Sequence, residues 1–149
     1  MAAAQVLDSH ALLKLLRDEA GAEAVAQILE KAGLRDQPVH MTDVNYAEVQ
    51  YIVRRKDGDA AWQAIAQELP AAPIEFHPTN RRLADLAADF KTRFKMSLAD
   101  AFAAALAKEK KAELVTGDPE FKPLEKEIKI VWLKRRLPPK NGTSKWPLT

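Results

Sequence analysis

The sequence contains no cysteine. Without cysteine the chain can form neither disulfide bonds nor thiolate metal sites, which is consistent with a reducing cytoplasm. Its apolar runs are far shorter than the roughly 18–20 residues that a membrane span requires. The N-terminal stretch MAAAQVLDSH has no basic segment ahead of an apolar one, so it does not resemble a secretory signal. We therefore expect a cytoplasmic protein with no membrane segment.

Neither sign of charge dominates, since 23 Lys and Arg against 21 Asp and Glu leave a formal charge of only +2. This balance does not by itself indicate a nucleic-acid-binding protein. A length of 149 residues with 47% hydrophobic and 30% charged residues is typical of one ordinary globular domain. We expect that domain to cover residues 1–136. Residues 137–149 contain Pro, Gly and Ser and are expected to form an irregular tail.

Short β-rich runs alternate with longer helical runs along the chain. This alternation predicts βαβ units, and hence an α/β protein with a parallel sheet and helices on both faces. Ligands of such sheets bind beyond the carboxyl ends of the strands. The expected strands are 5–8, 38–42, 73–76, 113–116 and 128–132, and Trp132 in the last strand is expected in the core. The expected helices are 9–19, 22–31, 43–56, 59–69, 79–94, 97–110 and a short one at 119–126.

Three aspartates stand where strands end or helices begin. Asp8 follows the first strand and Asp118 follows the fourth, and each could simply cap the helix that it opens. Asp100 lies in the alanine-rich stretch MSLADAFAAALA, where Ser97-x-x-Asp100 resembles a capping box. Capping is therefore an alternative explanation for each of the three.

Glu48 is harder to explain by capping, because its helix carries two apolar stripes; the alternative is a glutamate at the rim of that helix. Together with the three aspartates, it can converge on one edge of the sheet. Two carboxylates about 4 Å apart repel by roughly 4 kcal/mol at an effective dielectric constant near 20. Such a group requires a cation or shifted pKa values, and oxygen ligands select Mg²⁺ or Mn²⁺. The three histidines, His10, His40 and His77, show no pair at metal-ligand spacing, and we expect structural roles for them.

Four segments resemble the PIN domain, and most closely the VapC-like toxins of toxin–antitoxin pairs, over about residues 4–133. They are VLDSHALL at 6–13, NYAEV at 45–49, SLADAFAAALA at 97–107 and VTGDPEF at 115–121. The resemblance implies a five-stranded parallel sheet in a three-layer α/β/α sandwich. It also implies that Asp8, Glu48, Asp100 and Asp118 form an acidic quartet. Supporting positions are implied for Thr116, Ser9 and Glu120, whereas His10 departs from the small residue that is common there.

The implied reaction is Mg²⁺-dependent hydrolysis of phosphodiester bonds in RNA by an endoribonuclease, with Mn²⁺ as the alternative ion. Asp8, Asp100 and Asp118 would hold the metal, and Glu48 would complete its coordination or position water. The implied partners are the RNA substrate, an antitoxin protein and a second copy of the chain in a homodimer. With four acids committed to metal, the remaining formal charge is +2 plus 4, or +6, which favours phosphate binding.

Two other functions are compatible with the pattern to different degrees. A catalytically silent PIN-like module could bind RNA or protein, although such a module has no need for four converging acids. A receiver-like signalling domain would require a phospho-acceptor aspartate after the third strand, and this chain has Phe76, His77 and Pro78 there.

Overall fold

The computed structural model describes residues 2–134, so the tail expected at 137–149 lies outside the described residues. One five-stranded sheet has the strand order β3-β2-β1-β4-β5, and every neighbouring pair is parallel. The α/β fold with a five-stranded parallel sheet is therefore confirmed. The strands are β1 (Gln5–Leu7), β2 (Val39–Thr42), β3 (Ile74–His77), β4 (Glu113–Thr116) and β5 (Ile130–Trp132).

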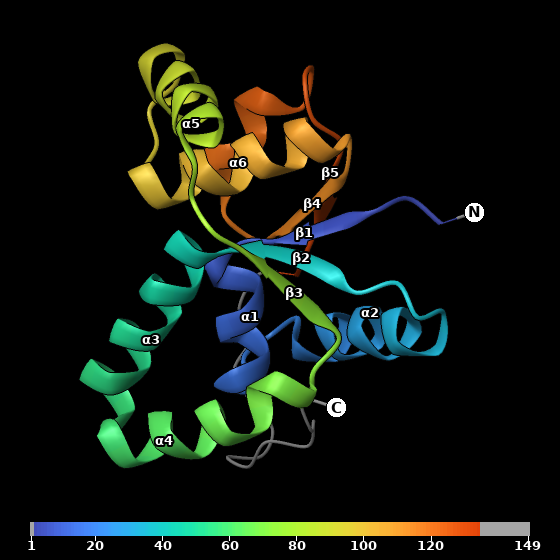
Figure 1. Ribbon diagram of the computed structural model, residues 1–149, viewed down its shortest axis with the longest axis vertical. Helices are drawn as coiled ribbons and strands as arrows, with labels where there is room; N and C mark the ends of the chain where they lie inside the picture. The colour runs from blue at the N-terminus through green and yellow to red at the C-terminus, as the bar shows by residue number, and fades with distance from the viewer. Residues whose placement is uncertain (1, 135–149) are drawn as a thin grey trace.

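Helices cover both faces of the sheet, which gives the expected three layers (Figure 1). One layer holds α1 (Ser9–Leu16), α2 (Ala22–Leu34), α3 (Asp43–Asp57) and α4 (Asp59–Glu68), and the short 3₁₀ helix η1 (Leu69–Ala71) follows α4. The other layer holds α5 (Arg81–Arg93) and α6 (Leu98–Lys110), and the 3₁₀ helix η2 (Pro119–Leu124) connects β4 to β5. Among the described residues, no helix combines the length and the hydropathy needed to cross a bilayer.

The two faces of the sheet are buried in two separate apolar cores because side chains alternate along each strand. Leu7 and Val115 point into the core shared with α1 to α4, whereas Val6 and Leu114 point into the core shared with α5 and α6. All four side chains are fully buried. The central strands β1 and β4 therefore carry consecutive apolar residues, as strands with two covered faces do.

Most elements lie within two or three residues of the ranges expected from sequence, and the differences have local causes. Helix α1 ends at Leu16 rather than at residue 19, since Asp18 has φ of 52° and turns the chain away. The segment after Asp118 is a 3₁₀ helix with Pro123 inside it. The expectation for Trp132 is wrong: its side chain is 39% exposed on the edge strand β5, and its indole N–H donates to Glu125 Oε2 at 3.1 Å.

Helix α6 is buried along almost its whole length. Every residue from position 100 to position 107 is buried, and five of them are alanines with no exposed surface or about 1%: Ala101, Ala103, Ala104, Ala105 and Ala107. Because alanine combines high helix propensity with a small side chain, α6 can lie close against the sheet on one side and α5 on the other. This close approach brings the start of α6 to the carboxyl ends of β1 and β4.

Ala104→Leu should therefore lower the free energy of unfolding by about 1–3 kcal/mol, the usual cost of overpacking a filled core. Ala88→Leu on the exposed face of α5 is the matched control and should change it by no more than about 0.5 kcal/mol. Urea unfolding followed by circular dichroism measures both. Equal urea midpoints for the two variants would contradict the close packing of α6.

Candidate metal centre

The carboxyl ends of the strands and the starts of α1, α3 and α6 meet at one edge of the sheet, on the left in Figure 1. Asp8 directly follows β1 and caps α1, and Asp118 follows β4 by two residues and caps η2. Asp100 lies in the first turn of α6 and Glu48 lies in the second turn of α3. The topology thus places all four predicted acids on this edge.

Asp8 and Asp118 are linked through the hydroxyl of Thr116, which is fully buried. This hydroxyl donates a hydrogen bond to Asp8 Oδ2 and accepts one from the backbone N–H of Asp118 at 3.0 Å. Strand register explains the contact, since Leu7 lies opposite Val115 and the next residues are therefore neighbours. The Thr116 side chain holds the ends of β1 and β4 in one fixed arrangement.

Capping accounts for only one oxygen of each of these aspartates. Asp8 Oδ1 accepts from the N–H of Ala11 at 2.8 Å, and Asp118 Oδ1 accepts from the N–H of Glu120 at 2.9 Å. The second oxygens face His10, whose Nδ1 lies 3.7 Å from Asp8 Oδ2 and 3.8 Å from Asp118 Oδ2. The capping and site interpretations are thus compatible, because each carboxylate has two oxygens.

The same holds for Asp100, where Ser97 Oγ accepts from the backbone N–H of Asp100 at 3.1 Å. That bond caps α6 but leaves the carboxylate unused, although only 3% of Asp100 is exposed. Burial, together with the negative charges of Asp118 and Asp8, raises the pKa of Asp100 from 3.8 to about 7.

His10 supplies the opposite charge at this edge. Its contact with Asp8 raises the pKa of His10 to about 9, burial acts against this increase, and the charges of Asp8, Asp118 and Asp100 support it. The imidazole is therefore cationic at neutral pH. The sequence predicted a structural role for His10, and its proximity to three acids was missed because spacing along the chain does not show it.

Glu48 stands slightly apart from the aspartates. Asp8, His10 and Asp100 each offer a ligand atom within 4.8 Å of the others, and so do Asp100, Asp118 and Glu120. Glu48 belongs to neither triad, but its charge contributes to the raised pKa of Asp100. Its Oε1 is buried and has no hydrogen-bond partner among residues 2–134. A buried carboxylate oxygen without a partner is costly, so it indicates a ligand that completes the site.

Asn45 connects the helices that carry the acids, and sequence reasoning did not single it out. Its side-chain NH₂ donates to Ser9 Oγ at 2.9 Å and to the backbone carbonyl of Ala99 at 3.2 Å. Thr42 caps α3 by accepting from the N–H of Asn45 at 2.9 Å, and its hydroxyl donates to Asn45 Oδ1. Ser9, expected near the acids, thus bonds to Asn45. Asn45 joins the starts of α1, α3 and α6.

The donor set fits a hard divalent cation. Carboxylate oxygens from Asp8, Asp100 and Asp118 converge on one edge, and Glu48 adds an oxygen that has no partner in the described part of the chain. Without a cation, the negative charge of the site is compensated by the proton that Asp100 retains and by the positive charge of His10. Oxygen-only ligation of this kind suits Mg²⁺ or Mn²⁺.

The fold and this centre define an α/β protein whose sheet edge carries acidic side chains that could bind a metal ion. A family model of the PIN domain matches residues 6–127, and the chain belongs to the PIN domain family. No curated protein sequence matches it.

Several solved structures share the fold. A chain of VapBC2 from Rickettsia felis, bound to a DNA fragment from its promoter, is 15% identical with a TM-score of 0.71, over 87% of this chain and 98% of that one. FitAcB from Neisseria gonorrhoeae is 20% identical with a TM-score of 0.64, over 85% and 95%. The sarcin–ricin loop cleaving toxin VapC20 from Mycobacterium tuberculosis is 16% identical with a TM-score of 0.63, over 81% and 95%. At these identities the likeness establishes the fold alone.

The raised pKa of Asp100 predicts how stability depends on pH in metal-free protein. Between the unfolded pKa of 3.8 and the folded value of about 7, the folded state holds a proton that the unfolded state has released. The contribution of Asp100 to the free energy of unfolding is therefore fully present below about pH 4 and is lost as the pH rises to about 7.

Asp100→Asn removes this dependence, so in EDTA the difference in stability between wild type and variant should shift in favour of the variant between about pH 5 and about pH 7. Urea titrations at both pH values measure the shift. Asp85→Asn, at an exposed position on α5, should show no such change. A constant difference between wild type and Asp100→Asn would contradict the raised pKa.

Proposed function

We propose that this protein is a Mg²⁺-dependent endoribonuclease that acts as the toxin of a toxin–antitoxin pair. The observation that carries the proposal is the meeting of Asp8, Asp100 and Asp118 at one edge, beside the unpartnered Oε1 of Glu48. Membership in the PIN domain family supports it.

Each site residue has a distinct part in the proposed reaction. Asp8 and Asp118 are held by Thr116 and by their capping bonds, so their Oδ2 atoms keep fixed positions as ligands. Asp100 would release its proton and serve as the third ligand. Glu48 would either complete the coordination or hold water. When bound, Mg²⁺ supplies Lewis-acid activation of water and stabilises the negative charge that develops on the attacked phosphate.

Further positions contribute at the rim. Glu120 offers a ligand atom in the triad with Asp100 and Asp118, and it is exposed, so it can adjust to a second ion. His10 lies beside Asp8 and Asp118, so its imidazole would lie close to a phosphate that binds at this edge. Each Mg²⁺ that the acids bind adds two positive charges, so the formal charge of +2 would become +4 with one ion and +6 with two, which favours RNA.

Several structural neighbours are toxin–antitoxin complexes, including one from Klebsiella pneumoniae at a TM-score of 0.61 and 17% identity. They support an antitoxin protein as the partner of this chain, and we propose a homodimer as its own assembly. This function would place the protein in the cytoplasm, with its RNA substrate.

The competing function is a catalytically silent PIN-like module that binds RNA or protein. The buried, unpartnered oxygen of Glu48 favours the nuclease, since a binding module gains nothing from the cost of that atom.

Purified protein with Mg²⁺ should cleave single-stranded RNA, and EDTA should stop the cleavage. Asp8→Asn should reduce the rate by at least roughly 100-fold, because even outer-shell partners of metal ligands cost up to that factor. Asp85→Asn on the exposed face of α5 is the matched control and should cleave like wild type. Gel electrophoresis of a labelled RNA measures the rates. Cleavage that is unchanged in Asp8→Asn, or RNA binding without any cleavage, would refute the nuclease.

The toxin role predicts a cellular effect. Induced expression of the wild-type chain without an antitoxin should arrest growth, whereas Asp100→Ala should not, because the site loses one of its three converging aspartates. Colony counts after induction, with matched protein levels on immunoblots, measure the effect. Two equally harmless proteins would contradict the toxin role while leaving RNA cleavage in vitro as a separate question.

A further inference from the structure

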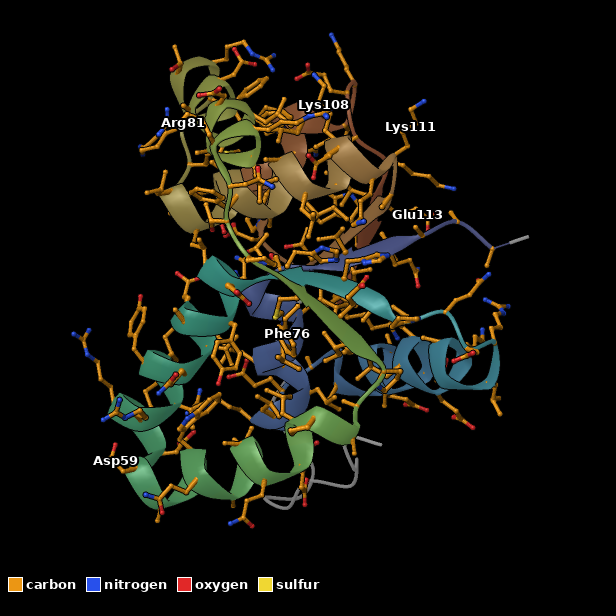
Figure 2. All side chains as sticks on the ribbon, in the orientation of Figure 1. Asp59, Phe76, Arg81, Lys108, Lys111 and Glu113 are labelled. Atoms are coloured by element: carbon orange, nitrogen blue, oxygen red, sulfur yellow. The ribbon has the colours of Figure 1, made fainter. Side chains whose placement is uncertain are left out.

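A second group of ligand-type side chains lies on the edge of the sheet formed by β2 and β3. His40 lies opposite Glu75 in the parallel register, and Thr42 lies opposite His77. Residues 75 and 77 alternate with Phe76, which packs into the core on the α1 side (Figure 2). Because strand side chains alternate, His40, Glu75 and His77 share the other face, which is the face that α6 covers.

Three atoms of this group form a compact triangle. His40 Nδ1 lies 2.9 Å from His77 Nε2, and Glu75 Oε2 lies 3.1 Å from the first and 3.3 Å from the second. Two ring nitrogens at that separation can share only one proton. At least one of them therefore offers a lone pair beside the carboxylate oxygen. Spacing along the sequence shows no pair of histidines at metal-ligand distance, yet His40 and His77 lie together in the fold. The 37 residues between them are bridged by strand register.

The triangle has the size of one face of a zinc tetrahedron. Zinc ligands at 2.0–2.1 Å in tetrahedral geometry lie about 3.3 Å from one another. The three measured separations fall at or slightly below this value, so a few tenths of an ångström of movement would admit the ion. Two imidazoles and one carboxylate are a common donor set for Zn²⁺, and they leave a fourth coordination position open.

This group is separate from the acidic edge described above. The charges of Lys110 and Glu109, at the end of α6, act on His77, and that of Lys110 also acts on His40. Asp100 lies at the start of the same helix, about 15 Å from Lys110 along the helix axis at 1.5 Å per residue. The donor types also differ, since imidazole nitrogens prefer Zn²⁺ or Cu²⁺ over Mg²⁺.

The surroundings allow an ion to enter. The side chains of His40 and His77 are only 15% and 20% exposed, while that of Glu75 is 54% exposed and can close over an ion. A cleft of about 630 Å³ is lined by His40 and Glu75 and opens beside them. Burial lowers the pKa of both histidines, and the positive charge of Lys110 also lowers it, which favours the neutral imidazole that can bind a metal ion.

We propose that His40, Glu75 and His77 form a second metal site, selective for zinc-type transition metals, that joins the edge strand β3 to β2. Its effect is structural. A bound ion would fix the end of β2, where Thr42 caps α3 and holds Asn45, and would thereby support the frame of the acidic edge. The alternative is a purely hydrogen-bonded cluster that binds no metal.

Nuclear magnetic resonance of the imidazole rings distinguishes the two, because the chain has only three histidines. One equivalent of Zn²⁺, added to the full-length metal-free protein at pH 7, should shift the ring signals of both His40 and His77. Saturating Mg²⁺ should leave these two unchanged. His10→Gln identifies the third set of signals by its loss. Signals of His40 and His77 that do not respond to Zn²⁺ would overturn the proposal.

Ligand variants supply the second measurement. Glu75→Gln should weaken zinc binding at least roughly tenfold by calorimetry, and His77→Ala should abolish the second site. In wild type, Zn²⁺ at about 100 times the dissociation constant should raise Tm by about 5 °C or more, and this increase should disappear in His77→Ala.

Asp8→Asn is the matched control, because it alters the acidic edge and should retain the zinc-induced shift of His40 and His77. Circular dichroism verifies that each variant is folded. A Tm increase that persists in folded His77→Ala would place the zinc elsewhere and refute the site. None of these readouts depends on RNA cleavage.

Discussion

Negative charge that is buried at one edge of a sheet is the constraint on which this structure depends. Three aspartates with little exposed surface come together there, and each would be unfavourable without compensation. In the folded protein this charge is compensated by the proton that Asp100 retains to about pH 7, by the imidazolium of His10 and by the hydroxyl of Thr116. In the function that we propose, a divalent cation would replace those partial compensations. The fold supplies the rigid backbone that keeps the carboxylates from moving apart.

The acidic edge could be predicted from sequence because parallel-sheet topology is a strong geometric rule. Asp8 and Asp118 follow apolar strands directly, so the parallel arrangement alone places them at the same edge. Asp100 was found because a charged residue in a run of alanines has no packing role. The capping interpretation was also correct, because helix-starting N–H groups do bond to these aspartates or to Ser97. Capping uses one oxygen of Asp8, one of Asp118 and none of Asp100, so the other oxygens remain for the site.

Contacts between strands and helices that are distant in the chain could not be predicted. Asn45 bonds to residues 36 and 54 positions away, and nothing in its neighbourhood in the sequence indicates either partner. The contact of His40 with His77 depends on the register between β2 and β3, and shifting that register by one residue would place them on opposite faces. The exposure of Trp132 follows from the position of β5 at the edge of the sheet, which the pattern of apolar residues does not determine.

The central strand β1 has only three residues, and it pairs with β4 at a separation of 108 positions. A ribosome that synthesises this protein therefore exposes Asp8 early, but its neighbours Asp100 and Asp118 follow only 92 and 110 residues later. The nascent polypeptide carries the acids apart from one another, and they assemble only when the last parallel strands dock. Any chemistry at this edge must therefore wait until β4 and Asp118 have been synthesised and β4 has docked against β1.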